Sequence, residues 1–144
     1  MLELKQLLVE TKQAWVEYPG LRGFEVEVAM LSRPALTKLR KGCITSKMNR
    51  RTREVEEDLD EDKFVAKFTE ATVKNWKGLT VEHLQTLVLI NTEGQDLTAE
   101  LEFSQDQAEM LVTNSTEFDT WLNEVVFDLD NFRSGTKRGE PEEA

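Results

Sequence analysis

Cysteine and histidine are nearly missing from this chain of 144 residues, which has one of each, Cys43 and His83. A single cysteine excludes a disulfide within the chain, and together with a single histidine it leaves a zinc site short of ligands. Any nucleophile–histidine pair would have to use His83, and no nucleophile motif surrounds it. This sparse cysteine usage is typical of proteins in a reducing cytoplasm.

Long apolar runs and an excess of basic residues are missing as well. No stretch approaches the roughly 18 uninterrupted apolar residues of a membrane span. The first residues, 1–5, lack the basic segment and apolar run of a secretory signal. Twenty-eight acidic residues against 18 basic ones give a net charge of −10. Because this charge repels phosphates and acidic headgroups, neither nucleic acid nor a membrane is expected as a partner.

Catalytic and metal-binding motifs are also lacking. The sequence contains no phosphate-binding loop and no dinucleotide fingerprint. An EF-hand loop started at Asp58 would place Lys63 where glycine is needed and Thr69 where the bidentate glutamate belongs. The acidic run is therefore interpreted as solvated surface, and Cys43 as a structural residue. We predict a protein without enzymatic activity, cofactor or metal.

What is present is the composition of one globular domain, with 39% hydrophobic and 32% charged residues. We predict that residues 1–132 form a single α+β domain, in which an N-terminal β-hairpin packs on a mainly helical remainder. Residues 133–144 contain no apolar residue larger than alanine. Such a segment has nothing to bury, so it is predicted to be a disordered C-terminal tail.

Alternation of apolar and polar residues marks the N-terminal third. It runs through 12–18 and again through 24–30, and the glycines and proline of 19–23 between them indicate a turn. This pattern predicts a hairpin with one buried face and one wet face. Residues 1–12 fit either a short helix or a strand. Ser32 is expected to cap a helix that ends at Gly42.

The segment 43–62 is divided by charge. Its first half is basic and its second half, from Glu54 to Asp62, is acidic. It is predicted to be a charged mobile loop or an exposed arm. Counted from Lys38 to Arg53, seven basic residues are followed by seven acidic ones, so the combined stretch is neutral. Nucleic-acid binding needs net positive potential, and an arm that pairs with a partner or with itself is the favoured use.

Helical spacing predicts the remaining elements. Phe64, Phe68 and Trp76 indicate a helix over 62–77. Thr80 is expected to cap a short helix that reaches Leu87, whereas 87–90 also fit a strand end, and 91–101 fit a loop or an irregular hairpin.

The last third contains two predicted helices. Ser104 and Gln107 have the spacing of a capping box, and 113–115 should end that helix and cap the next one. An apolar stripe then continues at helix spacing for four turns and must be buried by something. The stripe consists of Phe118, Trp121, Leu122, Val125, Leu129 and Phe132.

The three tryptophans can be core residues or interface residues, since both environments favour large aromatic side chains. The candidate protein-binding residues are the three tryptophans and three other large apolar residues. They are Trp15, Trp76, Leu79, Phe118, Trp121 and Phe132.

Several segments taken together resemble the tail assembly chaperones of long-tailed, siphovirus-type bacteriophages. The resemblance covers about 15–132. It lies in the Trp15 to Pro19 hairpin leading into 24–31, the Ser32-Arg33 helix start, the V-K-N-W-K-G-L segment at 73–79, the Phe103-Ser104 cap and the closing helix from E-F-D-T-W-L at 117–122 to D-L-D-N-F at 128–132.

The resemblance implies a role without catalysis. Such chaperones bind the tape measure protein in the host cell cytoplasm and keep it soluble until tail tube subunits polymerise around it. They are absent from the finished virion. The implied partners are the tape measure protein and, as a second candidate, the tail tube protein, with a homo-oligomer expected. The alternatives are a structural head–tail connector or a tail tube or terminator protein, and a nucleic-acid-binding regulator that uses 38–53.

Overall fold

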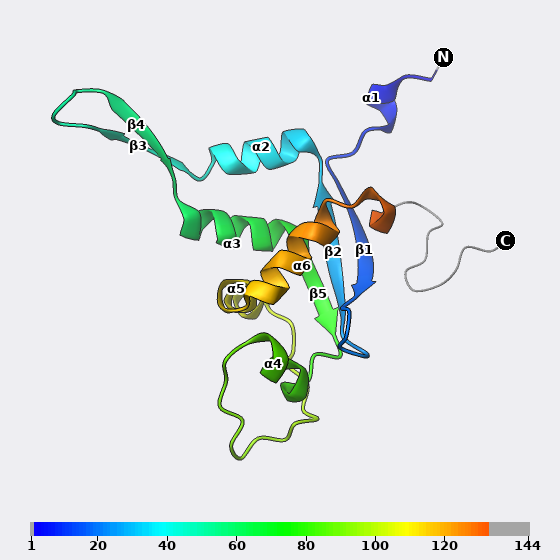
Figure 1. Ribbon diagram of the computed structural model, residues 1–144. Helices are drawn as coiled ribbons and strands as arrows, with labels where there is room; N and C mark the ends of the chain where they lie inside the picture. Colours follow the sequence, from blue (N-terminus) through cyan, green and yellow to red (C-terminus); the bar gives the residue numbers. More distant parts are fainter. Residues whose placement is uncertain (1, 133–144) are drawn as a thin grey trace.

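The computed structural model describes residues 2–132 and has the predicted α+β fold (Figure 1). Three antiparallel strands form a sheet in the order β1-β2-β5, with β1 at Thr11–Glu17, β2 at Glu25–Leu31 and β5 at Val73–Lys77. Helices α3 (Glu61–Thr72) and α6 (Thr116–Val126) pack on β2, and α5 (Gln105–Asn114) packs on β5. The N-terminal hairpin and the helices that follow it confirm the predicted class.

The hairpin has one buried and one wet face, as its alternation predicts. Val16 lies opposite Val26, and both are buried beneath the helices. The outer face carries Trp15, which is half-buried. The ammonium of Lys77 lies 4.8 Å from the centroid of the Trp15 ring and 3.5 Å from a carboxylate oxygen of Glu25. A cation and an aromatic ring therefore shield part of the outer face.

The strand β5 corrects the helix predicted over 62–77. Helix α3 ends at Thr72, and Val73 is already extended, with φ −101° and ψ 110°. The free edge of β2 offers backbone hydrogen bonds that a longer helix would leave unsatisfied, and the β-branched Val73 suits a strand. Trp76 pairs with Val26 in the sheet. Trp76 thus reaches the core from a strand, although its spacing fits a helix.

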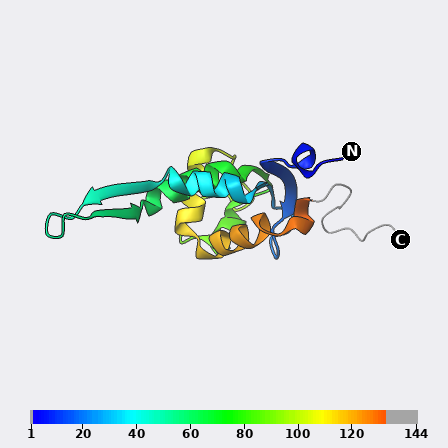
Figure 2. The same ribbon diagram turned by 90° about the horizontal axis from the view of Figure 1, so that it is seen from above.

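Residues 44–59 of the segment 43–62 form an exposed arm, one of the two forms expected for it, whereas Cys43 is buried and 61–62 begin α3. Its strands β3 (Ile44–Met48) and β4 (Val55–Leu59) make a separate antiparallel ribbon. Both views show this ribbon projecting beyond the body (Figures 1 and 2). It is attached through α3 and through α2 (Arg33–Lys41), whose start is capped by Ser32 and whose C-cap is Gly42, as predicted.

The short helix predicted from Thr80 to Leu87 is formed as α4 (Val81–Leu87), with Thr80 as its N-cap. Of the alternatives for the following residues, the strand end at 87–90 is not formed, because 88–101 contain no strand beyond a single bridge between Thr80 and Glu100. Two other predictions for the C-terminal half are corrected. The Ser104 hydroxyl accepts from the Gln107 amide at 3.1 Å, but the complete capping box lies at α4 instead. The apolar stripe predicted from Phe118 to Phe132 is also interrupted, because α6 ends at Val126.

A short 3₁₀ helix, η1 (Leu129–Phe132), follows α6, and the side chain of Leu129 is 64% exposed. The four-turn helix is therefore corrected to three turns and a separate 3₁₀ turn. At the N-terminus, α1 (Leu4–Leu7) is helical, and Thr11 begins the first strand. The predicted tail, 133–144, lies outside the described residues. Within 2–132, no helix combines the length and apolar character needed to cross a membrane.

The core lies between the sheet and the helices. The rings of Tyr18, Phe24, Phe118 and Trp121 form an aromatic cluster at its centre, with centroid separations from 4.8 to 6.4 Å. Phe24 and Phe118 are completely buried. Stacked and tilted rings at such distances add to the stability gained from burial alone.

Tyr18, the single tyrosine, makes the free energy of unfolding depend on pH in the alkaline range. Burial, and secondly the negative charge of Glu117, raise the pKa of Tyr18 to about 12. The unfolded chain loses this proton near pH 10, so the folded state holds it more tightly between the two values. The associated stability is present below about pH 10 and is lost as pH rises toward about 12.

We expect the free energy of unfolding to fall by at most about 3 kcal/mol over that range, and by less because water near the surface screens part of the effect. An ultraviolet titration of tyrosinate absorbance measures the pKa directly. Tyr18→Phe should remove the part of the alkaline loss that belongs to this hydroxyl. A tyrosinate transition near pH 10 in the folded protein would contradict the prediction.

Candidate protein-binding surface

The six predicted binding residues do not form one exposed surface. Five of them are buried in the core: Trp76, Leu79, Phe118, Trp121 and Phe132, all at most 8% exposed. Only Trp15 is half-buried, on the outer face of the sheet. The indole nitrogen of Trp76 donates to the Leu101 carbonyl at 2.9 Å, which fixes this side chain inside the fold. These five residues hold the fold together, and a docking surface must be sought elsewhere.

An apolar groove lies between α4 and α5. Its hollow has a volume of about 420 Å³ and is lined by Leu84, Val88, Leu89, Ile90, Leu101, Gln107, Met110, Leu111 and Asn114. The floor is anchored, because Leu111 is only 4% exposed. The rim is open: Leu89 is fully exposed and Met110 is 54% exposed. Exposed apolar side chains around an apolar hollow are typical of a surface that another chain covers.

The groove has the chemistry of a helix-binding site. One wall is α5, and the other is Leu84 of α4 with the non-helical segment 88–90 that follows it. The apolar floor between them can accept side chains spaced three and four residues apart on a partner helix. Met110 is unbranched and polarisable, so it can adapt to different partner side chains. Gln107 and Asn114 supply polar groups at its edge. The arrangement suits recognition of an apolar peptide.

A second apolar hollow lies where the N-terminal segment meets the sheet. Its lining includes Leu7, Leu8, Val9, Met30 and Leu129. The first three are each at least 59% exposed. One wall is built by α1, which has four residues and none that is buried. A wall with so little anchoring is a weaker template for a partner than the α4–α5 groove.

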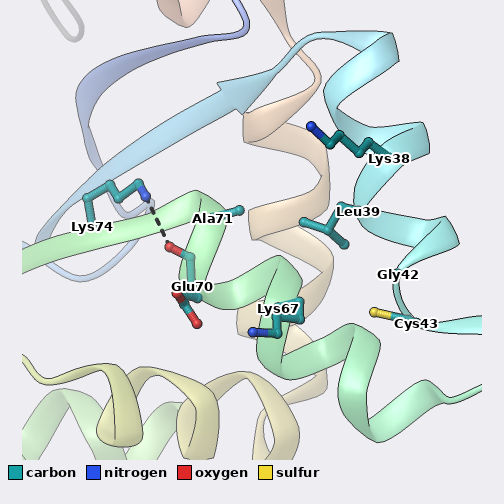
Figure 3. A pocket seen from close by; sticks show the side chains of 8 residues that line it. All are labelled: Lys38, Leu39, Gly42, Cys43, Lys67, Glu70, Ala71 and Lys74. Carbon is teal, nitrogen blue, oxygen red and sulfur yellow. Dashed lines mark hydrogen bonds between the residues drawn. The ribbon is translucent and has the colours of Figure 1, made fainter.

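Four of the eight residues that line the hollow between α2 and α3 are charged (Figure 3). Lys38, Lys67 and Lys74 surround it, and the Lys74 ammonium donates to the Glu70 carbonyl at 3.1 Å. Cys43 lies at one end, where its thiol is 1% exposed. No histidine is among the lining residues, so the hollow holds no cysteine–histidine pair. The structural role expected of Cys43 stays a prediction.

His83 caps a helix. The Thr80 hydroxyl accepts from the His83 amide at 3.2 Å, and the His83 Nδ1 lies 3.3 Å from the Thr80 amide and 3.0 Å from the Gly78 carbonyl. The two Nδ1 contacts need different tautomers: as Nδ1–H the ring donates to the Gly78 carbonyl, and as Nε2–H its Nδ1 accepts from the Thr80 amide and completes the capping box. Within 2–132, no cluster of three or more histidine, cysteine or carboxylate side chains has the arrangement of a metal site.

The sequence-based prediction did not include the exposed groove residues, because it relied on aromatic residues at helix spacing. A signal existed in the run Leu87-Val88-Leu89-Ile90. One side of a helix end cannot bury four consecutive apolar residues, so at least one of them must point outward. Comparisons of this chain with protein-family models, with curated proteins and with solved structures found no match.

Proposed function

We propose that this chain is a non-enzymatic chaperone of bacteriophage tail assembly that binds an apolar helical segment of the tape measure protein. The observation that carries the proposal is the α4–α5 groove, which exposes Leu89, Ile90 and Met110 around an apolar hollow. The segments that resemble tail assembly chaperones supply the identity of the client.

The charge of the molecule supports this role. A protein that keeps an apolar client soluble needs an apolar groove that binds the client. The rest of its surface needs charge of one sign, so that the complexes repel one another electrostatically. The groove is lined by uncharged residues, while the whole chain carries a net charge of −10. Complexes of several such chains on one client would repel each other and stay in solution.

The test is co-expression with the tape measure protein that this proposal predicts the same genome to encode. We expect the client to remain in the soluble fraction and to co-purify. The double variant Leu89→Asp/Met110→Asp places charge in the groove and should weaken co-purification by at least about tenfold, since an unpaired charge in a desolvated contact costs more than a lost apolar contact. Leu2→Asp is the matched control, because Leu2 is 74% exposed and lines neither apolar hollow.

A client that stays insoluble beside the wild-type protein would contradict the proposal, and so would equal binding by the groove variant and the control. Purified virions separate the proposal from its main alternative. A connector, tail tube or terminator protein is present in them at a fixed copy number, whereas a chaperone is absent. A tail tube gene upstream and a very long tape measure gene downstream would support the assignment independently.

A further inference from the structure

The part of the chain that builds the α4–α5 groove contains charge of only one sign. Residues 1–77 include 15 basic and 13 acidic residues, whereas 78–132 include 12 acidic residues and no lysine or arginine. With His83 neutral, the net charges of the two stretches are +2 and −12. All nine residues that line the groove fall between Leu84 and Asn114, inside the acidic stretch. The groove is therefore an apolar surface in an acidic part of the molecule.

Two carboxylates lie at the edge of the groove. Glu102 directly follows the lining residue Leu101, and Asp106 directly precedes the lining residue Gln107. Asp106 is also four residues before Met110 on α5, and residues at this spacing share one face of a helix. Both carboxylates are exposed, and neither has an ion pair within residues 2–132. They are thus available to a cation that approaches together with an apolar side chain.

The basic residues of the chain lie on other surfaces. Lys38, Lys67 and Lys74 surround the hollow between α2 and α3 (Figure 3), and three arginines lie in the turn 49–54 at the tip of the arm. None of these side chains lines the groove. A cation beside the apolar hollow therefore has to come from a partner.

We propose that the α4–α5 groove selects a basic amphipathic helix of its partner. The apolar side chains of that helix enter the hollow, and lysines or arginines beside them meet the acidic edge. Opposite charges around an apolar contact steer the correct segment to it, and like charges reject the wrong one. An acidic helix with the same apolar face would fill the hollow equally well but would place carboxylates beside Glu102 and Asp106. The inference rests on the groove being the binding surface of the proposed function, and it adds the charge of the client segment.

Three synthetic helical peptides test the charge preference on the purified wild-type protein. All three carry the same leucines spaced three and four residues apart, and the residues beside the leucines are lysine, glutamine or glutamate. Fluorescence anisotropy of the labelled peptides measures their affinities at about 0.1 M salt. We expect the lysine peptide to bind at least about tenfold more tightly than the glutamate peptide, with the glutamine peptide between them. At about 1 M salt, where the screening length falls to about 3 Å, the difference should largely disappear.

Two pairs of substitutions locate the peptide in the groove. Leu89→Ser/Met110→Ser removes exposed apolar side chains and should weaken the lysine and glutamine peptides alike, by at least about tenfold. Glu102→Gln/Asp106→Asn removes the charges at the edge and keeps the size of both side chains. It should weaken the lysine peptide by at least about threefold and leave the glutamine peptide unchanged.

Glu54→Gln/Asp58→Asn is the matched control for the second pair. It makes the same change in net charge on the arm, where both side chains are exposed. Figure 1 shows the arm and α4 at different ends of the molecule. Because salt screens exposed charges beyond about 10 Å at 0.1 M, the control should leave the affinity for the lysine peptide unchanged. Circular dichroism checks that every variant is folded.

The proposal would be overturned if the wild-type protein bound none of the peptides, or bound the lysine and glutamate peptides equally. Lysine-peptide binding that survives Leu89→Ser/Met110→Ser would also overturn it, because the attraction would then be non-specific, and so would equal effects of the two charge-removing pairs. These measurements need no tape measure protein. A client kept soluble despite equal peptide binding would leave the proposed function standing, whereas a clear preference beside an insoluble client would remove the proposed function alone.

Discussion

Gly78→Ala is expected to lower the free energy of unfolding by at least about 3 kcal/mol, from the cost of a left-handed alanine and of an enforced backbone shift together. Gly78 joins β5 to α4 with a φ of +74°. A Cβ atom at this position would overlap the carbonyl group of Gly23 in the β1–β2 turn. That carbonyl has little room to move, because the turn is closed by the bond from the Tyr18 amide to the Phe24 carbonyl at 2.9 Å.

Gly94→Ala is the matched control. Gly94 has nearly the same φ, +76°, but a Cβ atom there would meet nothing within 4 Å. It should therefore show only the backbone cost, about 1–2 kcal/mol. Urea denaturation of both variants measures the difference, which isolates the close approach of Gly78 and Gly23. Equal losses of unfolding free energy would contradict the prediction, because they would mean that the turn at Gly23 moves away from Gly78 at no cost.

Phe118→Ala should cost about 3–5 kcal/mol, the usual range when a large buried aromatic side chain is removed from a core. The Phe118 ring is completely buried, and its centroid lies 6.0 Å from that of Tyr18 and 5.5 Å from that of Trp121. The cavity would open at the contact between α6 and the sheet. Since a domain is stable by only about 5–15 kcal/mol, this variant should be close to unfolding at physiological temperature.

Phe127→Ala makes the same chemical change just after α6. Phe127 is 47% exposed, and its main aromatic contact is the Phe68 ring at 6.3 Å. It should cost only about 1 kcal/mol, because much of its surface is in water in both states. Denaturant unfolding and near-ultraviolet circular dichroism compare the two variants. A similar loss in both would place the centre of the core elsewhere.

The buried aromatic cluster also affects how binding experiments are interpreted. Variants of Trp121 or Phe118 would reduce the proposed client binding by unfolding the chain, and that loss would say nothing about the interface. Variants of Leu89 and Met110 leave the core intact, so a loss of binding in them reports on the groove itself. The fully exposed Leu89 is the most informative single position.

Sequence patterns predicted those parts of the fold in which residues close along the chain determine the conformation. The alternation through 12–18 and 24–30 determined the hairpin and its buried face, because side chains on a strand alternate between its two sides. Ser32, Thr80 and Ser104 determined three helix starts, since a cap hydroxyl bonds an amide only three residues away. The charge division of 43–62 indicated the exposed arm.

Tertiary structure decided what periodicity left undetermined. Trp76 fits a helical stripe as well as a strand, and only the free edge of β2 selected the strand. The six candidate binding residues followed from apolar character alone, which marks a core residue and an interface residue equally. Burial is a property of the assembled fold, because it depends on which distant elements pack together. The exposure of Leu89 and Met110 is visible only once all the helices and strands are in place.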